Sequence, residues 1–269
     1  MHYPLEFHFG AAKIPAHLLF EMLSYTLGYR LYVWQRARSQ DLISDDNRWW
    51  IFIGAAAGAL LGSHLLGIFE NPEHFSRLNL LVWMSNKTIV GGLLGGLAGV
   101  EITKKIIGVT TSSGDLMTYP LILGLAIGRL GCHFAGLTDG THGLPSSLPW
   151  AIDFGDGIPR HPVNFYEIIF LAALAGFIFW LENRGNARLS KFQKLGKSDS
   201  LANGARFKNF LIGYLVWRFF VEWLKPVYIF PFGLSTIQLA CLAGLFHYRK
   251  TIFQLKTFLP NNQELTTKN

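Results

Sequence analysis

Long apolar stretches alternate with short polar, charge-rich segments along the whole chain. A helix needs about 20 apolar residues to cross the roughly 30 Å hydrocarbon core of a bilayer, whereas a soluble core needs no run of that length. Seven stretches reach or approach it, at residues 14–34, 49–69, 81–100, 118–137, 163–180, 210–224 and 232–248. Only 15% of the residues are charged, against about 25% in soluble domains. The sequence therefore predicts an all-α polytopic membrane helix bundle, with residues 1–269 forming one integral membrane domain.

The distribution of lysine and arginine predicts the orientation of this bundle. Cytoplasmic loops collect positive residues, and seven spans place alternate loops on opposite sides of the membrane. One set of loops holds 16 of the 24 lysines and arginines, and the other set holds 5. This split predicts an external N-terminus, a cytoplasmic C-terminus, an external loop at residues 138–160 and a basic cytoplasmic loop at 185–207. It also accounts for the net charge of +7 without a nucleic-acid partner.

Polar and ionisable side chains within the spans fall at one predicted depth. Each ionisable residue costs on the order of 2.5 to 3.5 kcal/mol to insert, so it needs a reason to be there. With the orientation above, the outer part of four spans holds Arg129, His133, Glu167, Arg218, Glu222 and Gln238. Groups from four helices that converge at one depth predict a functional site near the outer leaflet.

The arginines of this group each have two interpretations. Arg218 and Glu222 lie four residues apart on one helix face, where they form either part of a site or a structural ion pair. Arg129 has no acidic residue one turn away. Its guanidinium suits a phosphate group, whose oxygens match the fork of N–H donors, and the alternative is contact with ordinary lipid headgroups.

The predicted external loop is longer than a usual connection and rich in glycine and proline, which favours a functional lid over a plain link. Its acidic and histidine side chains stand at no recognised metal-ligand spacing, so no metal site is predicted. The two cysteines lie inside apolar segments, and Cys132 is interpreted as a small packing residue. In the third span, the spacing of Gly91, Gly95 and Gly99 predicts tight helix packing.

Three motifs cover the polar positions of the predicted site. They are Gly128-Arg129-Leu130-Gly131, His161-Pro162-Val163-Asn164-Phe165-Tyr166-Glu167, and Gly213-Tyr214 followed by Arg218 and Glu222. Leu234-Ser235 and Gln238 continue the series in the last span. In motif order, spacing and predicted topology, the chain resembles the prolipoprotein diacylglyceryl transferase family of bacterial inner-membrane enzymes. The resemblance runs through nearly the whole chain, and the His-Pro-x-x-x-Tyr-Glu motif is its most specific part.

The resemblance implies a reaction and a set of site residues. The reaction transfers the diacylglyceryl group of phosphatidylglycerol to the lipobox cysteine thiol of a preprolipoprotein and releases glycerol phosphate, without a cofactor. It takes place in the lipid bilayer of the bacterial inner membrane, at an active site that faces the outer leaflet. The resemblance places site residues at Arg129, Arg218, Glu167, Glu222, Tyr166 and Gln238, and a first-span tyrosine at Tyr25.

The chain departs from the family pattern in two places. After Gly-Arg-x-Gly the family has Asn-Phe, where this chain has Cys132-His133-Phe134. The family has His-Gly-Gly-Leu where this chain has Val90-Gly91-Gly92-Leu93. A thiol of pKa about 8.5 needs a proton acceptor before it attacks, and a neutral histidine is the natural one. We therefore expect His133, one turn beyond Arg129, or His161 to act as the base.

Two other classes of function stay open. A relative on the same scaffold would use a different acceptor, or would bind lipid or lipoprotein without catalysis. A transporter or channel is the third class. The sequence lacks a pair of interrupted helices in corresponding halves, the pattern typical of transporter sites.

Overall fold

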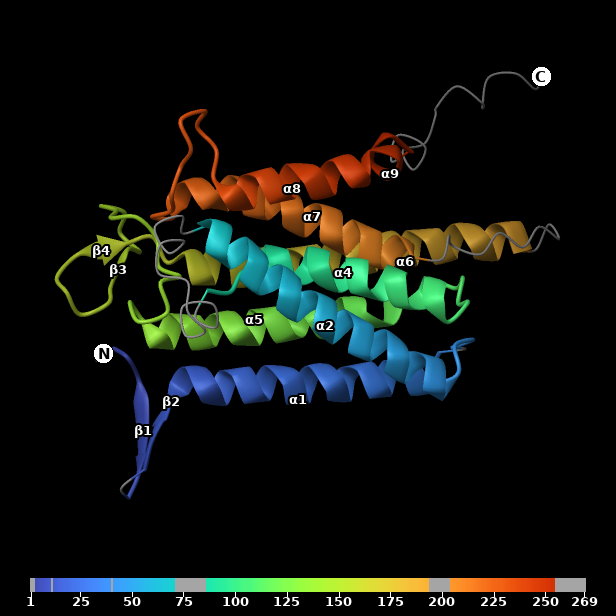
Figure 1. Ribbon diagram of the computed structural model, residues 1–269, viewed down its shortest axis with the longest axis horizontal. Helices are drawn as coiled ribbons and strands as arrows, with labels where there is room; N and C mark the ends of the chain where they lie inside the picture. The colour runs from blue at the N-terminus through green and yellow to red at the C-terminus, as the bar shows by residue number, and fades with distance from the viewer. Residues whose placement is uncertain (1–2, 11, 40, 71–85, 194–203, 255–269) are drawn as a thin grey trace.

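A computed structural model describes residues 3–10, 12–39, 41–70, 86–193 and 204–254. Most of this part is helical, in the order α1 (Ala16–Ala37), α2 (Asp45–Glu70), α4 (Ile89–Ile106), α5 (Thr118–Ala135), α6 (Val163–Gln193), α7 (Ala205–Val221), α8 (Thr236–His247) and α9 (Arg249–Gln254) (Figure 1). The helices from α1 to α8 run roughly along one direction, and successive helices point opposite ways. The predicted all-α class is therefore confirmed.

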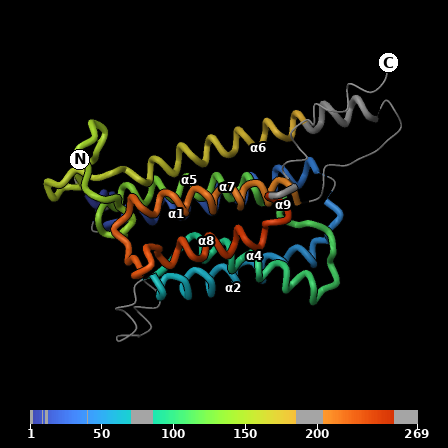
Figure 2. The backbone as a smooth tube through the Cα atoms, turned by 90° about the horizontal axis from the view of Figure 1, so that it is seen from above, coloured from blue at the N-terminus to red at the C-terminus, as the bar shows by residue number. Residues whose placement is uncertain are grey.

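The helices form three layers when the bundle is seen from above (Figure 2). α6 lies along one face, α1, α5 and α7 lie in the middle, and α2, α4 and α8 lie along the other face. The most extensive packing joins α2 to α4 and α1 to α5. On α7, Phe210, Leu211, Tyr214 and Leu215 are fully buried in the apolar core, which α6 and α8 also supply. Because α7 is central, the polar side chains near its end are held inside the bundle.

Each of the seven predicted spans overlaps one of these helices. Within the described residues, three segments are long and apolar enough to cross a membrane by length and composition: Asp45–Glu70, Asp115–Ala135 and Val163–Arg184. α8 is a shorter apolar helix of 12 residues. The helices thus support membrane character, whereas the count of seven spans and their orientation stay predictions. Residues 81–85 of the third predicted span lie outside the described residues.

α6 extends beyond the apolar stretch that predicted it. The predicted span ends at Trp180, but the helix continues to Gln193, into the segment expected to form the basic loop. An apolar stretch predicts only the part of a helix that can lie in the lipid. The helix itself continues, through backbone hydrogen bonds, until a residue such as proline ends it. No proline interrupts residues 181–193, so the helix persists through a polar sequence.

α2 and α4 pack through glycines that face each other. A Cβ atom at Gly58 would overlap the carbonyl oxygen of Gly95, and one at Gly95 would overlap that of Gly58. Gly62 and Gly91 are related in the same way. The predicted tight packing of the third span is therefore confirmed, and α2 supplies the partner surface.

Two short antiparallel hairpins, which the sequence did not indicate, lie at one end of the bundle (Figure 1). β1 (Glu6–Phe9) pairs with β2 (Ala12–Pro15), and β3 (Ile152–Asp153) pairs with β4 (Pro159–Arg160). The Leu5 N–H donates a hydrogen bond of 2.9 Å to the Phe134 carbonyl, which ties the N-terminal segment to the end of α5. At this end of the bundle, α5 and α7 finish and α1 and α6 begin.

The loop at residues 138–160 is held by its own acidic side chains. Asp153 Oδ1 accepts hydrogen bonds of 2.8, 3.1 and 3.0 Å from the successive backbone N–H groups of residues 155, 156 and 157. Asp156 binds Arg160 through two hydrogen bonds of 2.7 and 2.6 Å, and this contact lowers the pKa of Asp156 to about 2. These two carboxylates therefore build the turn of the loop.

Candidate functional site

Glu167, near the start of α6, is the centre of a buried group of charges. Its Oε2 lies 2.9 Å from Arg129 Nε of α5 and 3.6 Å from Arg218 Nη1 of α7. Its Oε1 accepts a hydrogen bond of 2.6 Å from the Tyr214 hydroxyl. Arg218 Nη2 also donates to Glu222 Oε2 at 2.8 Å. We call these five residues the arginine–carboxylate cluster, and none of them is more than 5% exposed.

The charges of the cluster balance, but its hydrogen bonds are incomplete. Two guanidinium groups meet two carboxylates, and such pairing is what makes buried charge tolerable. Arg218 Nε and Glu222 Oε1 are buried and have no hydrogen-bond or ion-pair partner among the described residues. A buried polar atom without a partner is costly, so these atoms suit a bound group that supplies the missing acceptors and donors.

A cavity of about 600 Å³ lies beside this cluster, between α1 and α5. Arg129 and Cys132 line it on the α5 side, and His17 and Tyr25 line it on the α1 side. Most of the remaining lining is apolar or aromatic. Of the five cluster residues, Arg129 alone lines the cavity. The site therefore combines an apolar space with a guanidinium at its wall, which is the arrangement a phospholipid needs.

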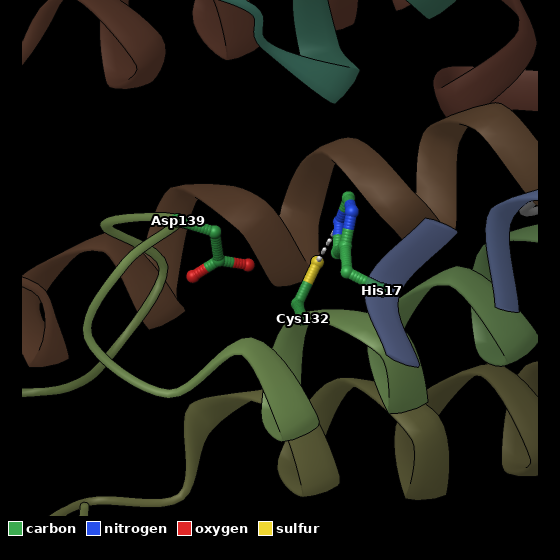
Figure 3. A group of neighbouring side chains, drawn as sticks. All are labelled: His17, Cys132 and Asp139. Carbon is green, nitrogen blue, oxygen red and sulfur yellow. Dashed lines mark hydrogen bonds between the residues drawn. The ribbon is translucent and has the colours of Figure 1, made fainter. Parts of the chain in front are cut away.

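Cys132 lies on the cavity wall, close to His17 and to Asp139 (Figure 3). Its Sγ lies 3.9 Å from His17 Nε2, and Arg129 Nη1 donates to it at 3.8 Å. The carboxylate of Asp139, from the turn after α5, joins His17 and Cys132 in a group whose polar atoms all lie within 4.8 Å of one another. The interpretation of Cys132 as a packing residue therefore overlooked its contact with the cavity.

Nitrogen, sulfur and oxygen are donor types that metal ions use, but the charge around this group disfavours a cation. The Arg129 guanidinium lies 3.8 Å from the Cys132 sulfur, so a divalent ion bound there would meet positive charge at close range. We therefore assign no metal to these side chains.

The two histidines indicated by the sequence lie near the cluster but do not line the cavity. His133 is 5% exposed; its Nε2 lies 3.1 Å from the Tyr3 hydroxyl, and its ring centroid lies 4.4 Å from that of Phe165. His161 Nδ1 lies 3.4 Å from the Tyr166 hydroxyl, in the segment before α6. Both histidines are thus at the same end of the bundle as the cluster, each with a local partner.

Tyr25 and Gln238 occupy separate places. Tyr25 lines the cavity although its side chain is 70% exposed, and its hydroxyl donates to Glu21 at 3.4 Å. Gln238 is buried at the start of α8, where its Oε1 accepts from the Ser235 N–H at 2.9 Å and its Nε2 donates to the Phe219 carbonyl at 3.1 Å. The structure therefore brings the predicted arginines and glutamates together and uses Gln238 to join α8 to α7.

Sequence reasoning missed three residues around the site. Tyr214 belongs to the Gly213-Tyr214 motif, which was the available signal, but its bond to Glu167 joins different helices. Burial, followed by the nearby charges of Arg218 and Arg129, lowers the pKa of Lys225, which the sequence treated as an ordinary loop residue. His17 is separated from Cys132 by 115 positions in the chain, so no local pattern marked it.

The fold and the site define a class of protein: a helical membrane protein with buried arginines, one of which lines a largely apolar cavity. A sequence profile described as prolipoprotein diacylglyceryl transferase matches residues 4–248. The chain therefore belongs to the prolipoprotein diacylglyceryl transferase family.

Similar proteins from several bacteria align with most of the chain. It is 31% identical over 220 residues to the phosphatidylglycerol–prolipoprotein diacylglyceryl transferase of Polynucleobacter necessarius subsp. necessarius, covering 77% of this chain and 78% of the relative. It is 29% identical over 251 residues to the transferase of the same name from Geobacter sulfurreducens, covering 90% and 86%. The profile match at residues 4–248 includes every helix that contributes to the cluster.

Proposed function

We propose that the protein transfers the diacylglyceryl group of phosphatidylglycerol to the lipobox cysteine thiol of a preprolipoprotein and releases glycerol phosphate. The observation that carries this proposal is the position of Arg129, which belongs both to the buried cluster and to the wall of the apolar cavity. A phospholipid whose acyl chains occupy the apolar part would bring its phosphate to this guanidinium. The family membership and the names of the relatives point to the same substrates.

The cluster supplies what the reaction needs at the phosphate. The thiolate attacks the glycerol carbon that carries the phosphate, and negative charge develops on the departing phosphate monoester. Arg129, on the cavity wall, and Arg218, joined to it through Glu167, are proposed to stabilise this charge through charge-assisted hydrogen bonds. Glu167 orients both guanidinium groups, and the Tyr214 hydroxyl holds Glu167 in place.

Glu222 is suited to the headgroup of the donor. Its Oε2 is used by Arg218, whereas its Oε1 is buried without a hydrogen-bond partner among the described residues. The terminal glycerol of phosphatidylglycerol carries hydroxyl groups that donate hydrogen bonds. A hydrogen bond from such a hydroxyl to a buried carboxylate oxygen is strongly stabilising. Glu222 is therefore proposed to favour a glycerol headgroup.

The remaining predicted residues keep proposed roles. Tyr25, which lines the cavity, and Tyr166, which lies beside His161, are proposed to contact substrate. Gln238 is proposed to act by holding α8 against α7. His133 and His161 are candidates for the base. Val90, at the position of the family histidine, is fully buried in the apolar core, which leaves the base to another residue.

The finer topology is part of the proposal. Seven spans in the bacterial inner membrane, with the N-terminus outside, would place the cluster toward the outer leaflet. Residues 138–160 would then be external, beside the acceptor peptide, and 185–207 would be cytoplasmic. The distribution of lysine and arginine supports this orientation.

The experiment that tests the function uses purified full-length protein, phosphatidylglycerol and a lipobox peptide. We expect glycerol phosphate release together with a mass gain on the peptide. A peptide with serine in place of its cysteine and a donor with an ethanolamine headgroup serve as controls, and neither is expected to react. Lipid binding without release of glycerol phosphate would indicate that the protein is a non-catalytic member of the family. Release of glycerol phosphate with another acceptor would indicate a member with a different acceptor.

A further inference from the structure

One histidine faces the cavity in which the reaction is proposed. Among the described residues that line this space, His17 is the single histidine. Its Nε2 faces Cys132 Sγ (Figure 3). The same sulfur also accepts a hydrogen bond from Arg129. One sulfur atom thus separates an imidazole from the guanidinium proposed to hold the donor phosphate. We propose that His17 is the base that accepts the proton of the acceptor thiol, an inference that rests on the proposed transfer reaction.

In this step, the S–H bond of the acceptor cysteine breaks and its proton passes to a ring nitrogen of His17. The resulting thiolate forms a C–S bond with the glycerol carbon that carries the phosphate. The C–O bond to phosphate breaks, and its electron pair leaves as negative charge on the phosphate monoester beside Arg129. The imidazolium then passes its proton to the departing phosphate or to water, which restores the neutral ring.

The groups around His17 carry charges of both signs. They are Glu21 one turn further along α1, Cys132 and Arg129 on α5, Asp139 in the turn after α5, and Lys87 in the segment before α4. The ring therefore lies in a polar part of the cavity wall, between the two helices that enclose the cavity.

The other histidines at this end of the bundle are less suited to the step. His133 Nε2 is engaged by the Tyr3 hydroxyl, and the ring is enclosed by aromatic side chains that include Phe165 and Phe154. His161 contacts Tyr166 in the loop segment before α6. Neither ring lines the cavity that contains Arg129.

The test compares His17→Gln with His133→Gln, His161→Gln and a matched control, His8→Gln, on the exposed β1 strand. Full-length protein in nanodiscs that contain phosphatidylglycerol receives a lipobox peptide, and glycerol phosphate release is followed from about pH 5.5 to about pH 8.5, the range in which a histidine base titrates. For His17→Gln we expect a fall in kcat of about 10²- to 10⁴-fold, with little change in KM for the lipid. The rise in rate near neutral pH should also disappear, whereas His8→Gln keeps both.

A second variant separates chemistry from structure. His17→Ala should regain activity when imidazole is added, because a free base then replaces the missing side chain, and a purely structural role would show no such rescue. A native rate and pH profile in His17→Gln would overturn the inference, and a loss in His133→Gln or His161→Gln would then assign the base there. Stoichiometric zinc that copurifies with the native protein and is absent from His17→Gln would overturn it as well. If the native protein releases no glycerol phosphate, the proposed function itself fails.

Discussion

At the scale of single residues, one carboxylate determines how two arginines are presented. Glu167 Oε2 engages Arg129 Nε and Arg218 Nη1, which leaves other N–H donors of both guanidinium groups for a ligand. Lysine would keep the positive charge but has a single nitrogen on a flexible stem. It therefore cannot hold Glu167 and a phosphate oxygen with the same geometry.

We predict that Arg129→Lys and Arg218→Lys each lower the rate of glycerol phosphate release by about 10²- to 10³-fold, the cost of losing one well-placed donor in a transition state. Arg160→Lys, in the ion pair with Asp156 in the β3–β4 loop, is the control and should stay close to the native rate. Native turnover in both cluster variants would show that the arginines do not bind the donor phosphate.

At the scale of elements, the contact between α2 and α4 depends on the absence of side chains. We predict that Gly95→Ala lowers the free energy of unfolding by about 1 to 3 kcal/mol, because its Cβ overlaps the Gly58 carbonyl and the helices must separate. Gly92→Ala is the matched control on the same helix, since its Cβ would lie 3.8 Å from Ser63 Cβ in ordinary contact. Thermal unfolding in detergent measures both, and equal midpoints would contradict this account of the packing.

The segment between α1 and α2 contains a carboxylate, Asp41, that holds two arginines. Asp41 accepts hydrogen bonds from Arg48 Nη2 at 2.6 Å and Arg36 Nε at 2.8 Å. Burial alone would raise the pKa of Asp41, but the hydrogen bonds from Arg48, the Ile43 N–H and Arg36 outweigh it, so the pKa is lowered. The ionised carboxylate is thus favoured by folding.

We therefore predict that Asp41→Asn destabilises the protein at pH 7 by about 3 kcal/mol, since the buried Arg48 loses its partner. The stabilisation is fully present above the unfolded pKa of about 3.9 and is lost as the pH falls through the lowered folded pKa. The difference in unfolding midpoint from the native protein should accordingly shrink below about pH 4. Asp46→Asn, at an exposed position of α2, is the control. A difference in unfolding midpoint between Asp41→Asn and the native protein that stays constant with pH would argue against the ion pair.

At the scale of the whole molecule, the two ends of the bundle differ. Both hairpins, the start of α1 and the start of α6 lie at one end, and the far end of α6 lies at the other (Figure 1). Glu167, the centre of the cluster, belongs to the first turns of α6. We predict that a single cysteine at Ser147 is labelled by an impermeant reagent from outside intact cells, in a variant that lacks the two native cysteines. A single cysteine at Lys197, which lies outside the described residues, should react only after lysis. Labelling of position 197 from outside would reverse the orientation and the side of the membrane from which the acceptor enters.

The sequence by itself determined the helical class, the apolar character of the segments and the arginines and glutamates of the cluster. These features depend on composition along the chain and on spacing within single helices, both of which are local. Only the tertiary structure decided that Glu167 joins two arginines from different helices, that Tyr214 holds it, and that His17 meets Cys132 across the contact between α1 and α5. Contacts between distant helices follow from how their surfaces fit together, and neither hydropathy nor the spacing of residues within one helix specifies that fit.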